Sequence, residues 1–315
     1  MIFEKHLENF KEYLFTNNFS ERTIEKYLES TKSFISFIEK YYRRIQLIEM
    51  ITKDIVSDYQ SYLANYKTNK GTHLTNRTQS NRLIGIKKFF QYLFKNDLIL
   101  NDPTKNITLP KGEDKIVRNI LTQDEVNEIL QNIRLDSPIK IRNRAIIELF
   151  YGCGIRTSEL CNLKITDVNL KEQTVTVIKG KGNKSRIIPI GQYACEYIKL
   201  YLEKARKFLL KGKLNDPGFL FLSNRGNSFD RSSINKCVIT SVIKTTKIKK
   251  HVSAYSFRHS IATHLLANKV DIMYIAQLLG HASLNTTQRY TRVEISDLKK
   301  VHSLTHPREK SLRDN

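Results

Sequence analysis

The sequence SAYSFRHSIATHLL at residues 253–266, followed by DIMYIAQLLGHASLNTTQRYTR at residues 271–292, decides what this chain can be. It places Arg258, His281 and Tyr290 around a compact stretch with helical spacing of its apolar residues. An arginine fork matches two phosphate oxygens, an imidazole moves a proton near neutral pH, and a tyrosine hydroxyl can form a covalent intermediate. Together these side chains suit the chemistry of a phosphodiester, although none of them indicates it alone.

The charge of the chain points to a polyanionic partner. Its 315 residues include 53 Lys and Arg against 31 Asp and Glu, a formal net charge of +22. A field of this size attracts polyanions, so nucleic acid is the leading partner and an anionic membrane surface the second. The charged start MIFEKHLENFKEYL and the lack of a long apolar run disfavour the membrane. We therefore expect a cytoplasmic protein that binds DNA.

The cysteines and histidines do not indicate a metal site. The four cysteines are Cys153, Cys161, Cys195 and Cys237. They lie far apart with no CxxC pair, so we expect reduced thiols in the core. His259 and His264 are separated by a spacing that puts them on different helix faces, unlike an i, i+4 pair of ligands. We expect no structural metal.

The first half of the chain predicts a helical bundle. Apolar residues recur at spacings of three and four from Phe3 to Asn96, with N-cap candidates at Ser20 and Thr52. The segment from Asn76 to Phe94 has an apolar side and a polar side, and the polar side carries Arg77, Gln79, Ser80, Arg82 and Lys87. These groups can bond phosphates and base edges, so Arg77, Arg82 and Lys87 are candidate DNA contacts. A solvated surface helix is the alternative.

A polar stretch, KNITLPKGEDKIVRN, separates two domains. It has no apolar period, contains Pro110 and Gly112, and alternates in charge. We expect a linker at residues 109–118, between an N-terminal helical domain at 1–108 and a second domain at 119–315.

The second domain mixes helices with a small hairpin. Thr122 and Glu125 form a predicted capping box. The predicted helices are Ile141–Tyr151, Gln192–Leu210 and Arg231–Thr246, and the predicted strands are Thr174–Ile178 and Ser185–Ile190. A glycine-rich turn with Lys181 joins the strands. The fold class is therefore mainly α with a small antiparallel β-sheet.

Each candidate site residue also has an ordinary explanation. Arg156, behind a glycine turn, is typical of a surface charge, and Lys181 of a solvated turn, because GKGNKSR lacks the GxxxxGK[ST] frame of a phosphate loop. His281 follows Gly280, as at a helix C-cap. Tyr290 is one of 15 tyrosines.

Five ordered motifs make the chain resemble the tyrosine recombinase (phage integrase) family, and most closely the bacterial Xer recombinases. The motifs are GCGIRTSELCNLKITDV, KGKGNKSRIIPIG, SFRHSIATHLL, LLGHASLNTTQRYT and LKKVHSLTHPR. KKFFQYLFKNDLILNDPTKNI is similar, more loosely, to the end of the family's N-terminal SAM-like DNA-binding bundle. The resemblance implies an N-terminal DNA-binding domain and a C-terminal α+β catalytic domain.

The resemblance also implies a reaction. Tyr290 would attack a DNA phosphodiester to give a 3′-phosphotyrosyl link, without cofactor or metal. Arg156 and Arg258 would clamp the non-bridging oxygens, and Lys181 would protonate the leaving 5′-oxygen as general acid. His281 would bond the phosphate or assist proton transfer.

Two further positions are compared with the family pattern. Glu159, one helical turn after Arg156, matches an acidic position that supports the active site; an ordinary surface carboxylate is the alternative. Tyr255 stands where the family has histidine, the base that usually accepts the nucleophile's proton. A phenol ionises near pH 10 and is a poor base at neutral pH. We expect cleavage to survive, with proton transfer carried by His281 or water.

The resemblance implies partners as well. These are a double-stranded DNA recombination site and further copies of the chain, as a tetramer on two sites. The tail Glu294–Leu304, with helical spacing of apolar residues, fits a helix folded on its own domain or docked on a neighbour, and the resemblance favours the neighbour. A second recombinase, a DNA translocase, the target sequence and the choice between dimer resolution and a mobile element stay open.

Two other functions fit the same sequence. One is a sequence-specific DNA-binding accessory protein with lapsed catalysis, suggested by Tyr255. The other is a type IB topoisomerase-like relaxer, which shares the covalent chemistry but needs neither the tail nor two bound sites.

Overall fold

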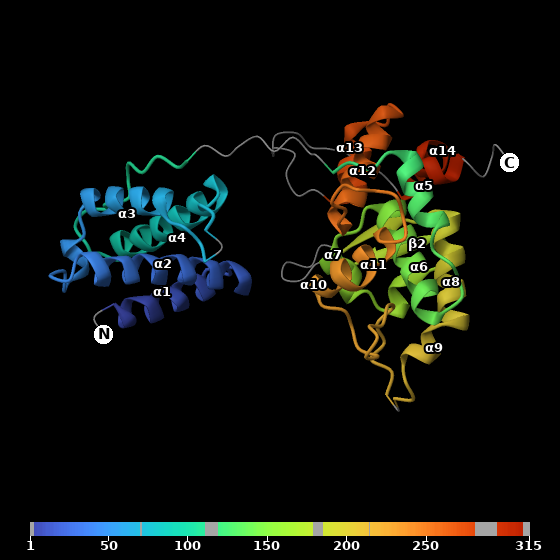
Figure 1. The fold of residues 1–315 in the computed structure, drawn as a ribbon, viewed down its shortest axis with the longest axis horizontal. Helices are drawn as coiled ribbons and strands as arrows, with labels where there is room; N and C mark the ends of the chain where they lie inside the picture. The colour runs from blue at the N-terminus through green and yellow to red at the C-terminus, as the bar shows by residue number, and fades with distance from the viewer. Residues whose placement is uncertain are drawn as a thin grey trace. The chain divides into compact units, whose positions relative to one another are not determined.

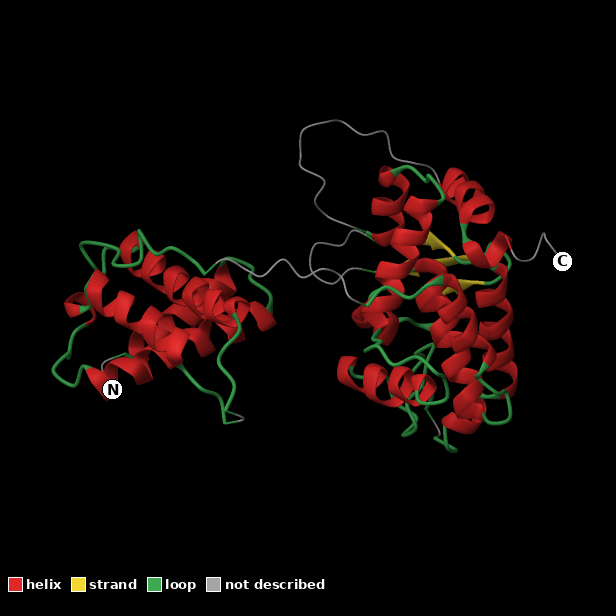
Figure 2. Cartoon of the chain, turned by 45° about the horizontal axis from the view of Figure 1, so that its top comes forward, coloured by secondary structure: helices red, strands yellow, loops and turns green. Residues whose placement is uncertain are grey.

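The structure is a computed structural model that describes residues 3–69, 71–110, 119–178, 185–213, 215–280 and 295–310. The chain divides into two compact units, Met1–Ile116 and Val117–Asn315, each with its own hydrophobic core. Helices make up most of both units, and the described strands lie in the second (Figure 1, Figure 2). The predicted class, mainly α with a small antiparallel sheet, is confirmed. Among the described helices none is long and apolar enough to cross a bilayer.

The first unit is a helical bundle built on an aromatic core. Its helices are α1 (Glu4–Thr16), α2 (Glu21–Tyr41), α3 (Lys53–Asn65) and α4 (Asn76–Lys95), with a 3₁₀ turn η1 (Ile48–Met50). The main contact is between α2 and α4, and Phe34 and Phe90 meet edge to face across it. Ser20 accepts a hydrogen bond from the Thr23 N–H and caps α2 as predicted. Thr52 precedes α3, without a side-chain capping bond.

Two residues of the predicted polar face of α4 are engaged within the unit. Gln79 is buried, and its side-chain amide donates to the Leu74 carbonyl at 2.9 Å. Ser80 donates to the Pro110 carbonyl at 3.0 Å. The start of the predicted linker is therefore bound to the first unit, while residues 111–118 lie outside the described part. The prediction that Gln79 faces outward is wrong, because its amide closes the turn that leads into the helix.

The second unit is organised around a buried helix. Its helices are α5 (Gln123–Gln131), α6 (Pro138–Cys153), α7 (Thr157–Asn162), η2 (Ile165–Asp167), α8 (Gln192–Lys204), α9 (Arg206–Leu209), α10 (Arg231–Ser233), η3 (Ile234–Ile239), α11 (Thr240–Ile243), α12 (Ala254–Ala267), α13 (Ile272–Leu279), α14 (Ile295–Thr305) and α15 (Pro307–Lys310). Helix α6 packs against α8 and α12 (Figure 1). The capping box of Thr122 and Glu125 at α5 is confirmed.

Two predicted helices are interrupted. The first breaks at Ala205, between α8 and α9, and the second contains η3, a π-helical segment. Cys237 lies in that segment and is exposed, which corrects its prediction as a core thiol; Cys153, Cys161 and Cys195 are buried, and all four are free.

The sheet is a three-stranded antiparallel meander. Its strands are β1 (Val168–Asn169), β2 (Thr174–Val177) and β3 (Arg186–Pro189), in that order. Val175 pairs with Ile188 on the buried face, and Thr176 pairs with the exposed Ile187. The predicted hairpin is present, and the short β1 is an addition to it. Lys181 lies outside the described residues.

The C-terminal segment 295–310, called the tail below, packs on its own unit. Helix α14 lies against β3. The Nε2 atom of His302 is 2.7 Å from the Gly152 carbonyl oxygen, and that of His306 is 3.2 Å from the Tyr151 carbonyl oxygen. The Arg308 N–H donates to His306 Nδ1 at 3.1 Å. Two neutral imidazoles thus cap the C-terminal end of α6. The single chain thus shows the helix folded on its own domain, and docking on a neighbour stays a prediction.

Acidification should loosen the tail. Burial lowers the pKa of His302 below 6.5 and that of His306 well below it, where the nearby His302 and Arg308 also lower it. Below pH 6.5 the docked tail therefore binds fewer protons than the released tail, so docking is fully stable above this pH and weakens as the pH falls. From pH 7.5 to 5.5 the open population should rise, by at most about tenfold for each histidine. Hydrogen exchange of tail amides, corrected for intrinsic rates, measures it.

The matched control replaces both His302 and His306 with glutamine. A glutamine amide can donate to the same carbonyls but does not titrate in this range. Its tail opening should be independent of pH. A wild-type tail that behaves like this control would contradict the prediction.

Candidate active site

A left-handed glycine positions the first arginine. Helix α6 ends at Gly154, which has φ of 59°, and a Cβ there would lie 2.5 Å from Leu279 Cδ2. Only glycine satisfies both the positive φ and this close approach. The turn brings Arg156 to the start of α7.

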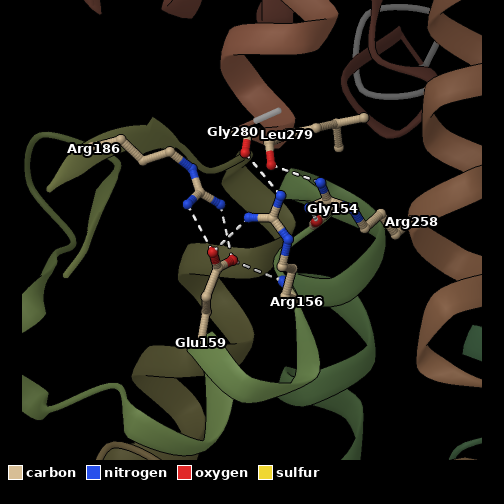
Figure 3. A network of polar contacts seen from close by, with 7 residues as sticks. All are labelled: Gly154, Arg156, Glu159, Arg186, Arg258, Leu279 and Gly280. Carbon is tan, nitrogen blue, oxygen red and sulfur yellow. Dashed lines mark hydrogen bonds and ion pairs between the residues drawn. The ribbon is translucent and has the colours of Figure 1, made fainter. Parts of the chain in front are cut away.

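Arg156 is fixed by a carboxylate and a carbonyl. Its backbone N–H donates to Glu159 Oε2 at 2.9 Å, and its NH1 donates to Glu159 Oε1 at 2.9 Å. Its NH2 donates to the Gly280 carbonyl oxygen at 2.8 Å, at the end of α13 (Figure 3). The side chain is still 37% exposed. Since a guanidinium has five N–H donors, Arg156 can keep these bonds and donate to a phosphate.

Arg258, on α12, lies deeper and is held by two carbonyls. Its NH1 donates to the Gly154 carbonyl, and its NH2 donates to the Leu279 carbonyl at 2.7 Å (Figure 3). The residue is only 5% exposed. Burial, and then the charge of Arg156, lowers its pKa to about 10, so it stays cationic at neutral pH. The structure thus brings the arginines of two distant motifs together.

Arg186, the first residue of β3, is a functional candidate that the sequence did not reveal. Its NH1 and NH2 each donate to one oxygen of Glu159 at 2.8 Å (Figure 3). A bidentate pair of this kind is short and directional. The basic character of KGKGNKSR hid Arg186 among other cations, and its partner lies in a different motif.

The environment of Glu159 keeps it ionised. Burial alone would raise its pKa, but the hydrogen bonds and charges of Arg186 and Arg156 outweigh burial and bring the pKa to about 2. Two guanidinium groups therefore bond one carboxylate, the charge of Arg258 lies nearby, and the cluster carries a net positive charge. That charge suits an anion such as a phosphate.

Tyr255 lies on the same helix as Arg258 and faces outward. Its side chain is 63% exposed, and its ring meets the His259 ring edge to face with centroids 4.1 Å apart. Burial and the neighbouring Arg258 lower the pKa of His259, which favours its neutral form. From the sequence, His259 was considered only as a metal ligand. In the structure it is an imidazole next to Tyr255, the position where the family has histidine.

Three predicted site residues, Lys181, His281 and Tyr290, lie outside the described residues. Gly280, the residue before His281, is described and has φ of 63° at the C-cap of α13. Helix α13 therefore ends at Gly280, as expected if Gly280 and His281 form a helix C-cap.

The candidate DNA contacts lie on α4 of the first unit. Arg77 is exposed, while Arg82 and Lys87 are partly buried. The Arg82 guanidinium carbon lies 5.8 Å from the centroid of the Tyr66 ring, a cation–π contact. The described residues of both units contain no group of three side chains that could hold a metal ion.

Two family profiles cover most of the chain. The profile of the Phage integrase family matches residues 119–296. The profile described as Phage integrase, N-terminal SAM-like domain, matches residues 6–100.

Curated relatives match over nearly the whole length. Tyrosine recombinase XerC of Bacillus pumilus is 35% identical over 301 residues, covering 95% of each chain. Tyrosine recombinase XerD of Oceanobacillus iheyensis is 32% identical over 308 residues, covering 98% of this chain and 100% of that one. Among solved structures, XerH bound to palindromic difH in a post-cleavage complex is similar with a TM-score of 0.64 and 22% identity, covering 92% of this chain and 78% of that one. That likeness shows a shared fold.

Removing the Glu159 charge should flatten the acid sensitivity of the second unit. Because the folded pKa of about 2 lies below the ordinary 4.5, the carboxylate stabilises the fold fully above pH 4.5 and loses this contribution as the pH falls toward 2. The loss is at most about 3 kcal/mol. Glu159→Gln should therefore be less stable than wild type at pH 6 and lose less stability by pH 3. Denaturant unfolding at both pH values measures this.

The control for this measurement is Glu196→Gln, which removes an exposed carboxylate of the same unit. Its stability should follow wild type at both pH values. If Glu159→Gln also followed wild type, the ion-pair network would not stabilise the unit.

Proposed function

This chain belongs to the phage integrase family, and we propose that it is a site-specific DNA recombinase of the Xer type that cleaves and rejoins DNA. The observation that carries the proposal is the cluster in which Arg156 and Arg258 are both fixed to the turn and helix end at Gly154, Leu279 and Gly280. Relatives named tyrosine recombinase match this chain over almost their full length. The proposed activity therefore rests on a likeness over the whole chain and not over one domain.

In the proposed reaction the arginines stabilise charge on the phosphorus centre. Arg156 is the more exposed of the two and would meet a non-bridging oxygen first. Arg258 lies behind it and adds positive charge that is already oriented before DNA arrives. Such preorganised donors gain most when charge develops on a pentacoordinate transition state, the phosphoryl equivalent of an oxyanion.

The covalent steps are assigned through the family motifs. The Tyr290 hydroxyl attacks the phosphorus, a new P–O bond to tyrosine forms, and the bond to the 5′-oxygen breaks. Lys181 gives the leaving oxygen its proton, and His281 or water takes the proton that the Tyr290 hydroxyl loses. His281 can also bond the phosphate. The reverse of the same steps rejoins the strand, because the bond energy is kept in the phosphotyrosyl link. No cofactor takes part in this scheme.

The proposed partners are a duplex recombination site and further copies of the chain. Arg77, Arg82 and Lys87 of the first unit would contact the duplex. Relatives in solved structures are bound to DNA sites, including XerH with difH. We extend this to a tetramer on two sites, in which the tail that caps α6 in the single chain exchanges to a neighbour.

The two alternative functions have less support. An accessory protein with lapsed catalysis would not need the full set of family site residues that this sequence has, which is Arg156, Lys181, Arg258, His281 and Tyr290. For a topoisomerase-like relaxer, we would not expect relatives that match over nearly their whole length to be named recombinases. Both alternatives can still be separated by experiment.

The direct test is a covalent trap. Wild type and Tyr290→Phe are incubated with a library of nicked duplexes, in which cleavage releases a short fragment and prevents rejoining. We expect adducts resistant to SDS from wild type only, since a phenyl ring has no attacking oxygen. Sequencing the trapped DNA gives the recognition site. Adducts should persist in Tyr255→Phe, the matched loss of a different hydroxyl.

Three results would redirect the proposal. Absence of wild-type adducts with sequence-selective binding intact would favour the lapsed enzyme. Adducts that map to Tyr255 would move the nucleophile. Relaxation of supercoiled DNA without recombination between two sites would favour the relaxer.

Restoring an imidazole at position 255 should speed cleavage. Tyr255→His supplies a base that works near neutral pH, where a phenol does not. We expect a severalfold higher single-turnover rate, with the gain growing as the pH rises through about 6.5. Tyr255→Gln is the control because it offers hydrogen bonds without a base. Equal rates for the two variants would mean that a base at this position is not what limits the reaction.

A further inference from the structure

Arg186 connects three segments that carry the site. It begins β3, on the strand that follows the Lys181 turn in sequence, and its side chain is 13% exposed. Both of its terminal nitrogens donate to Glu159 on α7. Its guanidinium also lies close to the end of α13, where a Cβ on Gly280 would come within 2.7 Å of Arg186 Cζ. Only a glycine leaves room for this contact.

The geometry makes Arg156 depend on Arg186. The Glu159 oxygens that receive Arg186 also receive the backbone and side chain of Arg156. Gly280, against which Arg186 packs, supplies the other anchor of Arg156 through its carbonyl (Figure 3). Arg186 therefore supports both bonds that aim the more exposed phosphate ligand.

We propose that Arg186 is a positioning residue for strand cleavage: it neutralises Glu159, so that Arg156 is oriented by the carboxylate without losing its net positive charge to it. Without Arg186, the single carboxylate and Arg156 form a neutral pair, and the attraction of the pair for a phosphate falls. With Arg186, the same carboxylate orients Arg156, and Arg156, Glu159 and Arg186 together keep one net positive charge. This inference rests on the proposed recombinase function.

Arg186 acts through Glu159 rather than on DNA. Its two terminal nitrogens are both directed at the carboxylate, and its Nε is buried with no hydrogen-bond partner among the described residues. A residue of this kind should affect the cleavage step more than DNA affinity, because the orientation and charge of Arg156 matter most when charge develops at phosphorus.

The test is a suppressor experiment on four forms of the full chain: wild type, Arg186→Met, Glu159→Gln and the double variant. Single-turnover adduct formation is measured on a nicked duplex at saturating protein, and DNA affinity is measured with each change in a Tyr290→Phe background. Arg186→Met should slow cleavage by about 100-fold, the scale of losing one preorganised donor, while DNA affinity changes less than about threefold. The double variant should recover at least about tenfold, because the uncompensated carboxylate is gone.

A matched pair elsewhere separates this role from simple stability. Arg206 and Asp216 form another bidentate ion pair in the same unit. Arg206→Met removes a guanidinium that is 7% exposed, against 13% for Arg186, but should leave the cleavage rate of folded protein within about threefold of wild type. Arg186→Lys keeps the charge, and its cleavage rate should lie between those of wild type and Arg186→Met. If Arg186→Met does not fold, Arg186→Lys with and without Glu159→Gln carries the same comparison.

The outcomes distinguish the two proposals. No wild-type adduct on any nicked duplex overturns the recombinase function itself. A wild-type adduct with undiminished cleavage in folded Arg186 variants overturns the positioning role alone. A double variant no faster than Arg186→Met also overturns it, because the proposal attributes the slow cleavage of Arg186→Met to the uncompensated carboxylate of Glu159.

Discussion

The ionised carboxylate of Glu159 is the interaction on which the site depends. Guanidinium groups repel one another, and Arg156, Arg186 and Arg258 lie in one cluster. A single negative charge among them offsets part of this repulsion and gives two of them a fixed direction. The carboxylate also joins α7 to β3, so the motif that contains Arg156 and the stem of the hairpin are held together. The site is thus assembled by electrostatics across segments that are distant in sequence.

The buried helix α6 provides the frame for that carboxylate. It is buried from Ile141 to Cys153 and ends at Gly154, whose carbonyl receives Arg258. The last turn of the same helix receives His302 and His306 from the tail. One helix terminus therefore links the arginines proposed to bind phosphate to the segment proposed to exchange between protomers. A change in how the tail docks on α6 would therefore alter the position of the turn that carries Arg156.

Local chemistry was predictable from sequence, and long-range pairing was not. The capping box of Thr122 and the glycine end of α6 depend on residues within one turn, so their patterns are visible in the chain. The π segment and the break at Ala205 depend on packing and left no signal. Gln79 looked polar and exposed, yet a single backbone carbonyl turned it inward. Arg186 was missed for the same reason, since nothing in KGKGNKSR shows which of its cations faces a carboxylate.

The carbonyl bonds of Arg258 have a consequence for the encounter with DNA. A free arginine side chain moves among many rotamers, and ordering it costs up to about 2 kcal/mol of conformational entropy. Here the side chain is already immobilised between Gly154 and Leu279 when the chain folds. The ordering cost then falls on the stability of the protein and not on the binding of a substrate. A scissile phosphate would meet a rigid receptor, so more of its interaction energy remains for distorting the phosphorus centre toward the transition state.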